Sequence, residues 1–201
     1  MLLKSGICMP ASWSSDGRFL LYDTNIEVKS NNFDVMVLPL GGDRKSLPFV
    51  QTKHNELDGH FSPDMRWVAY QSDESGRHEI HVRRFSKDTG KPSAEAWEPW
   101  QVSTDGGMGP RWGREGKELY YRAPNGKVMV ADVAAGPTFQ TGTPKPLFQA
   151  PPDLSEPGAL YSSPVWDVTS DGNRFLIPAP VAETSPAPFT VILNWTSLIK
   201  K

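Results

Sequence analysis

The chain has 201 residues, of which 38% are hydrophobic and 22% charged, a composition typical of soluble globular proteins with one substantial core. Its 21 basic and 23 acidic side chains leave a formal charge of −2, which excludes the strong positive field that phosphate-backbone binding needs. The longest apolar runs, such as 35–38 and 191–193, are far shorter than the roughly 20 residues of a membrane helix. We therefore expect neither nucleic-acid binding nor a membrane span.

The N-terminal segment, MLLKSG, has too short an apolar stretch for a secretory signal peptide and lacks a typical cleavage site. As written, the chain is expected to stay in the cytoplasm. Its one cysteine, Cys8, cannot form an internal disulfide.

The first expected unit covers about residues 9–52. Residues 13–23 (WSSDGRFLLYD) predict a β-hairpin, because tight turns need a positive φ that Gly supplies without a Cβ clash and a preceding Asp tolerates. Third and fourth strands are expected at 34–40 and 46–52, so the unit forms a small antiparallel sheet.

The second unit, about 57–104, repeats this pattern with a hairpin at 61–71 (FSPDMRWVAYQ) and strands at 79–85 and 99–104. It carries Met65 where the first unit has Gly17. If this position keeps a positive φ, methionine costs about 1 kcal/mol relative to glycine. The sequence therefore predicts that Met65→Gly raises the melting temperature.

Two more units follow, at about 108–150 and 160–195. The third has a hairpin at 112–122 and strands at 127–133 and 146–150. The fourth has a hairpin at 168–178 and a third strand at 189–195, but no fourth strand.

The four hairpins align as one repeat. Their acidic turn positions lie 48, 51 and 56 residues apart, a spacing typical of propeller blades: Asp16, Asp64, Glu115 and Asp171. In the aligned repeats, one position before the turn is apolar in every unit: Trp13, Phe61, Trp112 and Val168. A second apolar position follows the turn: Tyr22, Tyr70, Tyr121 and Ile177. We call each set an apolar column. These columns predict a core repeated from sheet to sheet, in a single all-β propeller domain spanning 1–201 with about four four-stranded blades.

Two ways of completing the ring stay open. An N-terminal strand at 2–7 would supply the missing strand of the fourth blade and close the ring by main-chain hydrogen bonds. Alternatively, the chain is part of a larger ring, or its open blade edges join two copies into an eight-bladed homodimer.

Residues 61–70 (FSPDMRWVAY) resemble the TolB-type, WD-like propeller repeats of bacteria. The order of LPLGGDR, FSPD, WQVSTDGG and VILNW is similar to the C-terminal propeller of bacterial receptor-type serine/threonine kinases. The chain has no Gly-rich phosphate loop, His-Arg-Asp or Asp-Phe-Gly segment, so kinase activity is not implied. The resemblance implies part of a longer sensor or receptor-like protein, for which a periplasmic or extracellular location is expected.

All four histidines lie in the second unit, at 54, 60, 78 and 81. His54, Asp58 and His60 approach its first strand and form the better candidate trio for a divalent metal or for catalysis. Ser62 is a weaker candidate, as a nucleophile beside His60, because a serine there is ordinary turn structure in the resembled repeats. No Gly-x-Ser-x-Gly elbow supports a hydrolase.

The favoured function is a noncatalytic scaffold that binds a protein, a peptide or a small ligand near the central channel. It needs no cofactor. The alternatives are a hydrolase of esterase or peptidase type, or a metal-dependent enzyme, with its site in the second blade.

Overall fold

The computed structural model describes residues 7–26, 32–92, 98–134, 136–151 and 165–179, and the structural statements below concern these residues. The predicted strand at 189–195 lies outside them. So does the predicted strand at 2–7, except for Ile7, which belongs to no strand.

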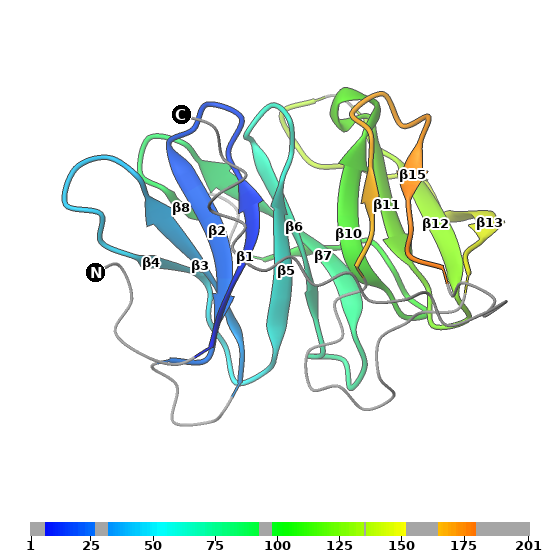
Figure 1. Ribbon diagram of the computed structural model, residues 1–201, viewed down its shortest axis with the longest axis horizontal. Coiled ribbons are helices and arrows are strands. Elements are labelled where there is room, and N and C mark those ends of the chain that lie inside the picture. Colours follow the sequence, from blue (N-terminus) through cyan, green and yellow to red (C-terminus); the bar gives the residue numbers. More distant parts are fainter. Residues whose placement is uncertain (1–6, 27–31, 93–97, 135, 152–164, 180–201) are drawn as a thin grey trace, which may run out of the picture.

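The described chain forms antiparallel sheets whose strands follow one another in sequence order (Figure 1). Blade 1 contains β1 (Cys8–Trp13), β2 (Phe19–Thr24), β3 (Asp34–Pro39) and β4 (Leu47–Val50). Blade 2 contains β5 (Glu56–Phe61), β6 (Trp67–Ser72), β7 (Glu79–Ser86), β8 (Lys91–Pro92) and β9 (Trp100–Gln101). Blade 3 contains β10 (Met108–Gly113), β11 (Glu118–Arg122), β12 (Lys127–Asp132) and β13 (Lys145–Gln149). Of blade 4, the structure describes β14 (Asp167–Val168) and β15 (Phe175–Leu176).

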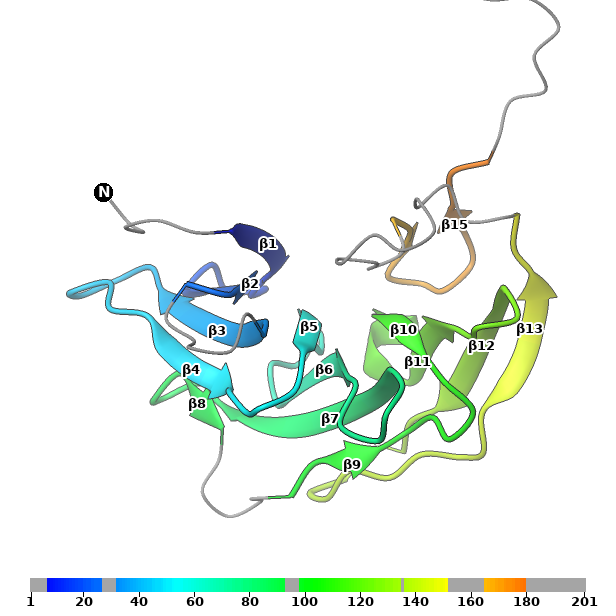
Figure 2. The same ribbon diagram turned by 90° about the horizontal axis from the view of Figure 1, so that it is seen from below.

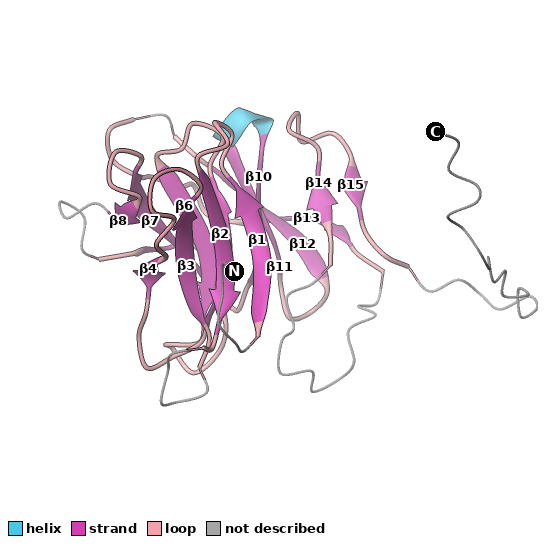
Figure 3. Cartoon of the chain, turned by 60° about the vertical axis from the view of Figure 1, so that its left-hand side comes forward, coloured by secondary structure: helices cyan, strands magenta, loops and turns pink. Residues whose placement is uncertain are grey.

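The sheets stand side by side as the blades of a β-propeller, with β1, β5 and β10 on the inner side of an arc and β4, β9 and β13 on the outer side (Figure 2). The described part of the chain is strand and loop, apart from one turn of 3-10 helix, η1 (Arg114–Gly116) (Figure 3). Among the same residues, no helix has the length and apolar character needed to cross a bilayer. The predicted all-β propeller is confirmed.

The outer part of blade 2 differs from the prediction of one strand at 99–104. Two short strands, β8 and β9, pair with different parts of the long strand β7. Phe85 lies opposite Pro92, and His81 lies opposite Gln101. The eight-residue length of β7 explains the difference, because it leaves room for two partners along one edge.

The predicted turn chemistry is confirmed in blades 1, 2 and 4. In blade 2, Ser62 Oγ donates to Asp64 Oδ1 at 2.7 Å and accepts the Trp67 N–H at 3.0 Å. Blade 1 has the same arrangement at Ser14 and Asp16. The residues at the glycine position have φ values of 72°, 61°, 87° and 73° in the four blades: Gly17, Met65, Gly116 and Gly172.

Blade 3 forms this turn differently because Gly113 replaces the hydroxyl residue that organises the others. Without that side chain the segment winds into η1, with positive φ values at Arg114 and Glu115. The substitution has a steric reason, since a Cβ on Gly113 would lie 2.3 Å from Cε2 of Tyr120. Tight packing of β10 on β11 therefore excludes the serine found in blades 1 and 2.

Hydrophobic clusters fill the spaces between neighbouring blades. The cluster between blades 1 and 2 includes Leu21, Val35, Phe61 and Phe85. The next joins Trp67 and Ile80 of blade 2 to Trp112 and Leu119 of blade 3, and a third joins Tyr120 of blade 3 to Trp166 before β14. Phe61 and Trp112 each pack against the preceding blade, as the repeated columns predict. Trp13 is exposed, because no preceding sheet covers it among the described residues.

Met65→Gly is now expected to lower the melting temperature, the reverse of the sequence-based prediction. The positive φ is present, but the Met65 side chain is buried in the cluster between blades 1 and 2. Relief of the backbone strain would raise the free energy of unfolding by about 1 kcal/mol, whereas removal of a buried methionine side chain would lower it by about 2–5 kcal/mol. Differential scanning calorimetry would check this, and a raised melting temperature would show that the strain outweighs the packing.

Candidate functional site

The first strands of the four blades carry polar residues at one equivalent position. Each lies directly before the apolar column and opposite the same place on the second strand: Ser12 pairs with Leu21, His60 with Ala69, Arg111 with Tyr120 and Asp167 with Leu176. A register irregularity precedes this position in blades 1, 2 and 3. Such bulges re-aim side chains, and here they occur where the strands line the inner side of the arc.

Three of these residues meet at a pocket of about 230 Å³. His60, Arg111 and Asp167 contribute the polar groups. The rest of the lining comes from the apolar column and from the turns: Trp13, Phe61, Trp112 and Val168, with Ser15, Ser62, Pro63 and Ser170. The pocket thus lies where the first strands run into their hairpin turns, on the inner side of the arc. In a closed propeller this side lines the central channel, so we call it the channel-mouth pocket.

A buried ion pair links two blades beneath this mouth. Arg111 Nη1 of blade 3 donates to Asp58 Oδ2 of blade 2 at 2.9 Å, with both side chains almost fully buried. Arg111 Nε also donates to the Trp166 carbonyl at 3.1 Å. One guanidinium therefore connects blades 2, 3 and 4.

Burial and the Asp58–Arg111 pair determine the charge states of the residues at this site. Burial alone would raise the pKa of Asp58, but the charge of Arg111 and the close contact with the His60 imidazole outweigh it and hold that pKa below the ordinary value. Burial and the nearby Arg111 lower the pKa of His60, against the attraction of Asp58. At neutral pH the site therefore holds a charged Asp58–Arg111 pair, a neutral His60 and the exposed carboxylate of Asp167.

Blade 1 adds a second buried carboxyl group to this network. Asp23 Oδ2 accepts the Asp58 N–H at 2.8 Å. Burial raises the pKa of Asp23 well above its ordinary value, and the neighbouring Asp58 charge adds to the effect. Asp23 therefore favours its neutral form more than a free aspartate does, while the neighbouring Asp58 is paired with Arg111.

No protein-family model matches the chain, and no curated protein matches it in sequence. Solved structures do match. A protein described as TolB from Agrobacterium tumefaciens is similar with a TM-score of 0.53 at 17% identity, over 70% of this chain and 50% of that one. TolB from Acinetobacter baumannii gives a TM-score of 0.51 at 19% identity, over 71% and 33%. A protein described as a 6-phosphogluconolactonase from Bacteroides uniformis gives 0.51 at 13% identity, over 83% and 46%.

The fold is a TolB-like β-propeller. At these identities the likeness concerns the fold alone, which agrees with the repeat seen in the sequence. The matched part of the chain spans between 33% and 50% of the length of these three proteins.

The propeller brings together two members of the predicted metal trio but not the third. His60 Nε2 lies 3.3 Å from Asp58 Oδ1. His54 lies instead beside Asp73, with 3.8 Å between Nδ1 and Oδ1. Within the described ranges, no three His, Cys, Asp or Glu side chains are grouped so that they could hold a metal ion.

Ser62, the weaker nucleophile candidate, lines the channel-mouth pocket, but its hydroxyl group is engaged in the hairpin turn. It donates to Asp64 and accepts from the Trp67 N–H. Ser14 makes the same contacts in blade 1, where no histidine precedes the turn. These contacts are those of a turn residue and do not direct the oxygen toward His60.

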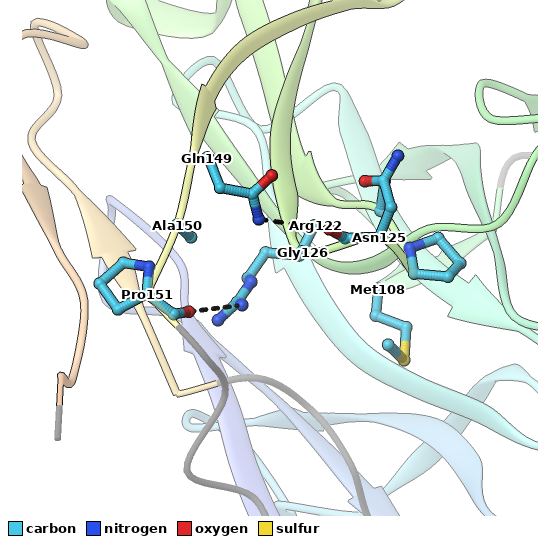
Figure 4. Close-up of a pocket in the computed structure, with 9 residues that line it drawn as sticks. Met108, Arg122, Asn125, Gly126, Gln149, Ala150 and Pro151 are labelled. Atoms are coloured by element: carbon cyan, nitrogen blue, oxygen red, sulfur yellow. Dashed lines mark hydrogen bonds between the residues drawn. The ribbon is translucent and has the colours of Figure 1, made fainter.

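A larger pocket, of about 470 Å³, lies between the β11–β12 turn and the end of β13 (Figure 4). Its polar side chains are engaged with the backbone. Arg122 Nη2 donates to the Pro151 carbonyl at 3.3 Å, and Gln149 Nε2 donates to the Asn125 carbonyl at 3.2 Å. The residues that line this pocket include no carboxyl group, histidine or thiol, so the smaller pocket at the channel mouth is the better candidate site.

Arg111 and Asp167 are the site residues that the sequence-based search missed. The signal was present one residue before each aligned segment, where Ser12, His60, Arg111 and Asp167 stand in the four repeats. The ligand-type residues of the second unit are neighbours in sequence, but neighbours in sequence need not meet in a propeller. A repeat protein gathers residues from equal positions of successive units, so a search along that column finds them.

Proposed function

We propose that the protein is a noncatalytic binding module that holds a short basic peptide segment at the channel mouth. The observation that supports this proposal most strongly is the distribution of charge in the pocket. Arg111 is neutralised by Asp58 and His60 is neutral, which leaves the exposed Asp167 carboxylate beside apolar walls from Phe61, Trp112 and Val168. This combination suits a lysine, arginine or N-terminal amine flanked by apolar side chains.

Selection of a random heptapeptide phage library against the full chain tests this proposal. We expect enriched peptides to carry a basic residue next to an aromatic or aliphatic one. Binding of a synthetic copy, measured by fluorescence anisotropy, should weaken about tenfold or more in Asp167→Asn, because a charge-assisted hydrogen bond is lost.

Asp132→Asn is the matched control, since Asp132 is another exposed carboxylate, lies on β12 and does not line the channel-mouth pocket. It should leave the dissociation constant unchanged. Selected peptides without a basic residue, or equal binding by wild type and Asp167→Asn, would contradict the proposal.

The Asp58–His60 contact supports a hydrolase as the second candidate. A carboxylate 3.3 Å from a neutral imidazole is the arrangement of an oriented general base. Assays with p-nitrophenyl butyrate and fluorogenic casein decide between the candidates. Turnover by the wild type that disappears in His60→Ala would favour the enzyme, whereas its absence together with peptide binding favours the binding module.

The sequence resemblance to kinase-linked propellers supports a role for this module in a longer receptor-like protein. In that setting a channel-mouth site would sense a peptide ligand outside the cytoplasm. Fractionation of cells that produce the full-length parent, with antibody detection of the propeller, checks the location.

A further inference from the structure

The His60 imidazole lies between opposite charges in the channel-mouth pocket. Its Nε2 atom is 3.3 Å from Asp58 Oδ1, and 19% of its side chain is exposed. The same Asp58 carboxylate is paired with Arg111 at 2.9 Å, and Arg111 lines the pocket together with His60. Uptake of a proton by His60 would thus add a positive charge to a pocket that already contains a guanidinium group.

The charged and titratable groups around His60 come from four strands. Burial of the ring, followed by the charge of Arg111 on β10, lowers the pKa of His60 below its ordinary value of 6.5. Asp58 on β5 and Asp167 on β14 oppose this shift, because their carboxylates favour the protonated imidazole. Asp23 on β2 lies behind Asp58, where its Oδ2 accepts the Asp58 N–H at 2.8 Å, and burial favours its neutral form. His60 is therefore neutral at pH 7 and takes up a proton only as the pH falls below 6.5.

A cation bound at Asp167 would change this balance in two ways. It would neutralise a carboxylate that favours the protonated form of His60. It would also add a positive charge to a pocket of about 230 Å³ that His60 itself lines. Two positive charges in so small a space repel each other. The effect is reciprocal, so a bound cation disfavours the proton on His60, and that proton weakens the binding of the cation.

We propose that the channel-mouth pocket is a proton-linked site, which holds a cationic side chain at neutral pH and releases it in mild acid when His60 is protonated. The inference rests on the proposed function, because the ligand at Asp167 carries the second positive charge. It adds the condition under which the ligand is released.

Isothermal titration calorimetry of the full chain with the peptide acetyl-Phe-Lys-Phe-amide tests the proposal. The wild type is expected to bind about fivefold to tenfold more weakly at pH 5.5 than at pH 7.5, with its native circular dichroism spectrum retained at both values. His60→Gln removes the titrating imidazole, so its dissociation constant should be the same at the two pH values.

A measurement on the unsubstituted protein reports the same coupling directly. The pKa of His60, followed by NMR from its ring protons, should fall when the peptide is added at saturating concentration. A pKa that stays the same or rises would show that the bound cation does not act on His60.

His54→Gln is the matched control, because His54 is another histidine of blade 2 that lies beside Asp73 and does not line the pocket. It should retain the pH dependence of the wild type. Equal affinity of the wild type at both pH values, or an unchanged pH dependence in His60→Gln, overturns the proton linkage while the peptide site stands. Absence of binding at pH 7.5 contradicts the channel-mouth site itself, and the linkage with it.

Discussion

Replacement of Arg111 by methionine is expected to lower the free energy of unfolding by about 3–5 kcal/mol at pH 7. The substitution leaves the Asp58 carboxylate buried without its 2.9 Å partner. It also removes the guanidinium that donates to the Trp166 carbonyl of blade 4. Urea titrations followed by tryptophan fluorescence measure the loss.

The pH dependence separates a lost ion pair from lost packing. The folded pKa of Asp58 is below its ordinary value of 3.8, so in the wild type its stabilisation is present above about pH 4 and disappears as the pH falls through the folded value. Without Arg111, burial is expected to raise the pKa of Asp58. The variant therefore regains stability when Asp58 takes up a proton at lower pH. The deficit of Arg111→Met should therefore shrink as the pH is lowered from 7 to about 4.

Asp58→Asn in the Arg111→Met background is the control, since asparagine tolerates the φ of 55° and carries no charge. It should restore part of the lost stability at pH 7. A deficit below about 1 kcal/mol, or one of equal size at pH 7 and pH 4, would show that the two side chains do not form the buried pair.

Phe85→Ala is expected to destabilise the protein by about 3–5 kcal/mol, with a fall in melting temperature of about 6–20 °C. The Phe85 ring lies 5.3 Å from that of Phe19 and 4.9 Å from that of Phe61, in edge-to-face geometry. Its removal opens a cavity between blades 1 and 2. Calorimetry measures the melting temperature.

Leu147→Ala serves as the comparison for Phe85→Ala, because truncation of an exposed leucine should change stability by less than about 0.5 kcal/mol. Equal, small effects of the two substitutions would mean that the blades do not share a core at Phe85.

The propeller could be predicted because its signals are local and repeated. An acidic residue followed by glycine sets the turn in blades 1 and 4, and the positive φ expected at Met65 is present in blade 2. The alternation of apolar and polar residues along each strand determines which face of the strand is buried. The reversed expectation for Met65→Gly shows the limit of this reasoning, because the turn geometry is local whereas the burial of the side chain depends on the neighbouring blade.

The candidate site was predicted in part. Asp58 and His60 lie on one strand and could be found from sequence proximity, but their partner Arg111 lies 53 residues from Asp58 and on another sheet. His54 is close to Asp58 and His60 in sequence, but it lies before β5 and contacts Asp73 instead. Positions that are equivalent in a repeat, and not positions that are adjacent in the chain, determine which side chains meet at the channel.

A crystal structure of the full chain tests most directly the claim that equal positions of the four repeats gather at one channel mouth. We expect β1, β5, β10 and β14 to stand around a common axis, with His60, Arg111 and Asp167 lining one pocket and Arg111 paired with Asp58. First strands that face different sides of the molecule, with these side chains on separate surfaces, would contradict it.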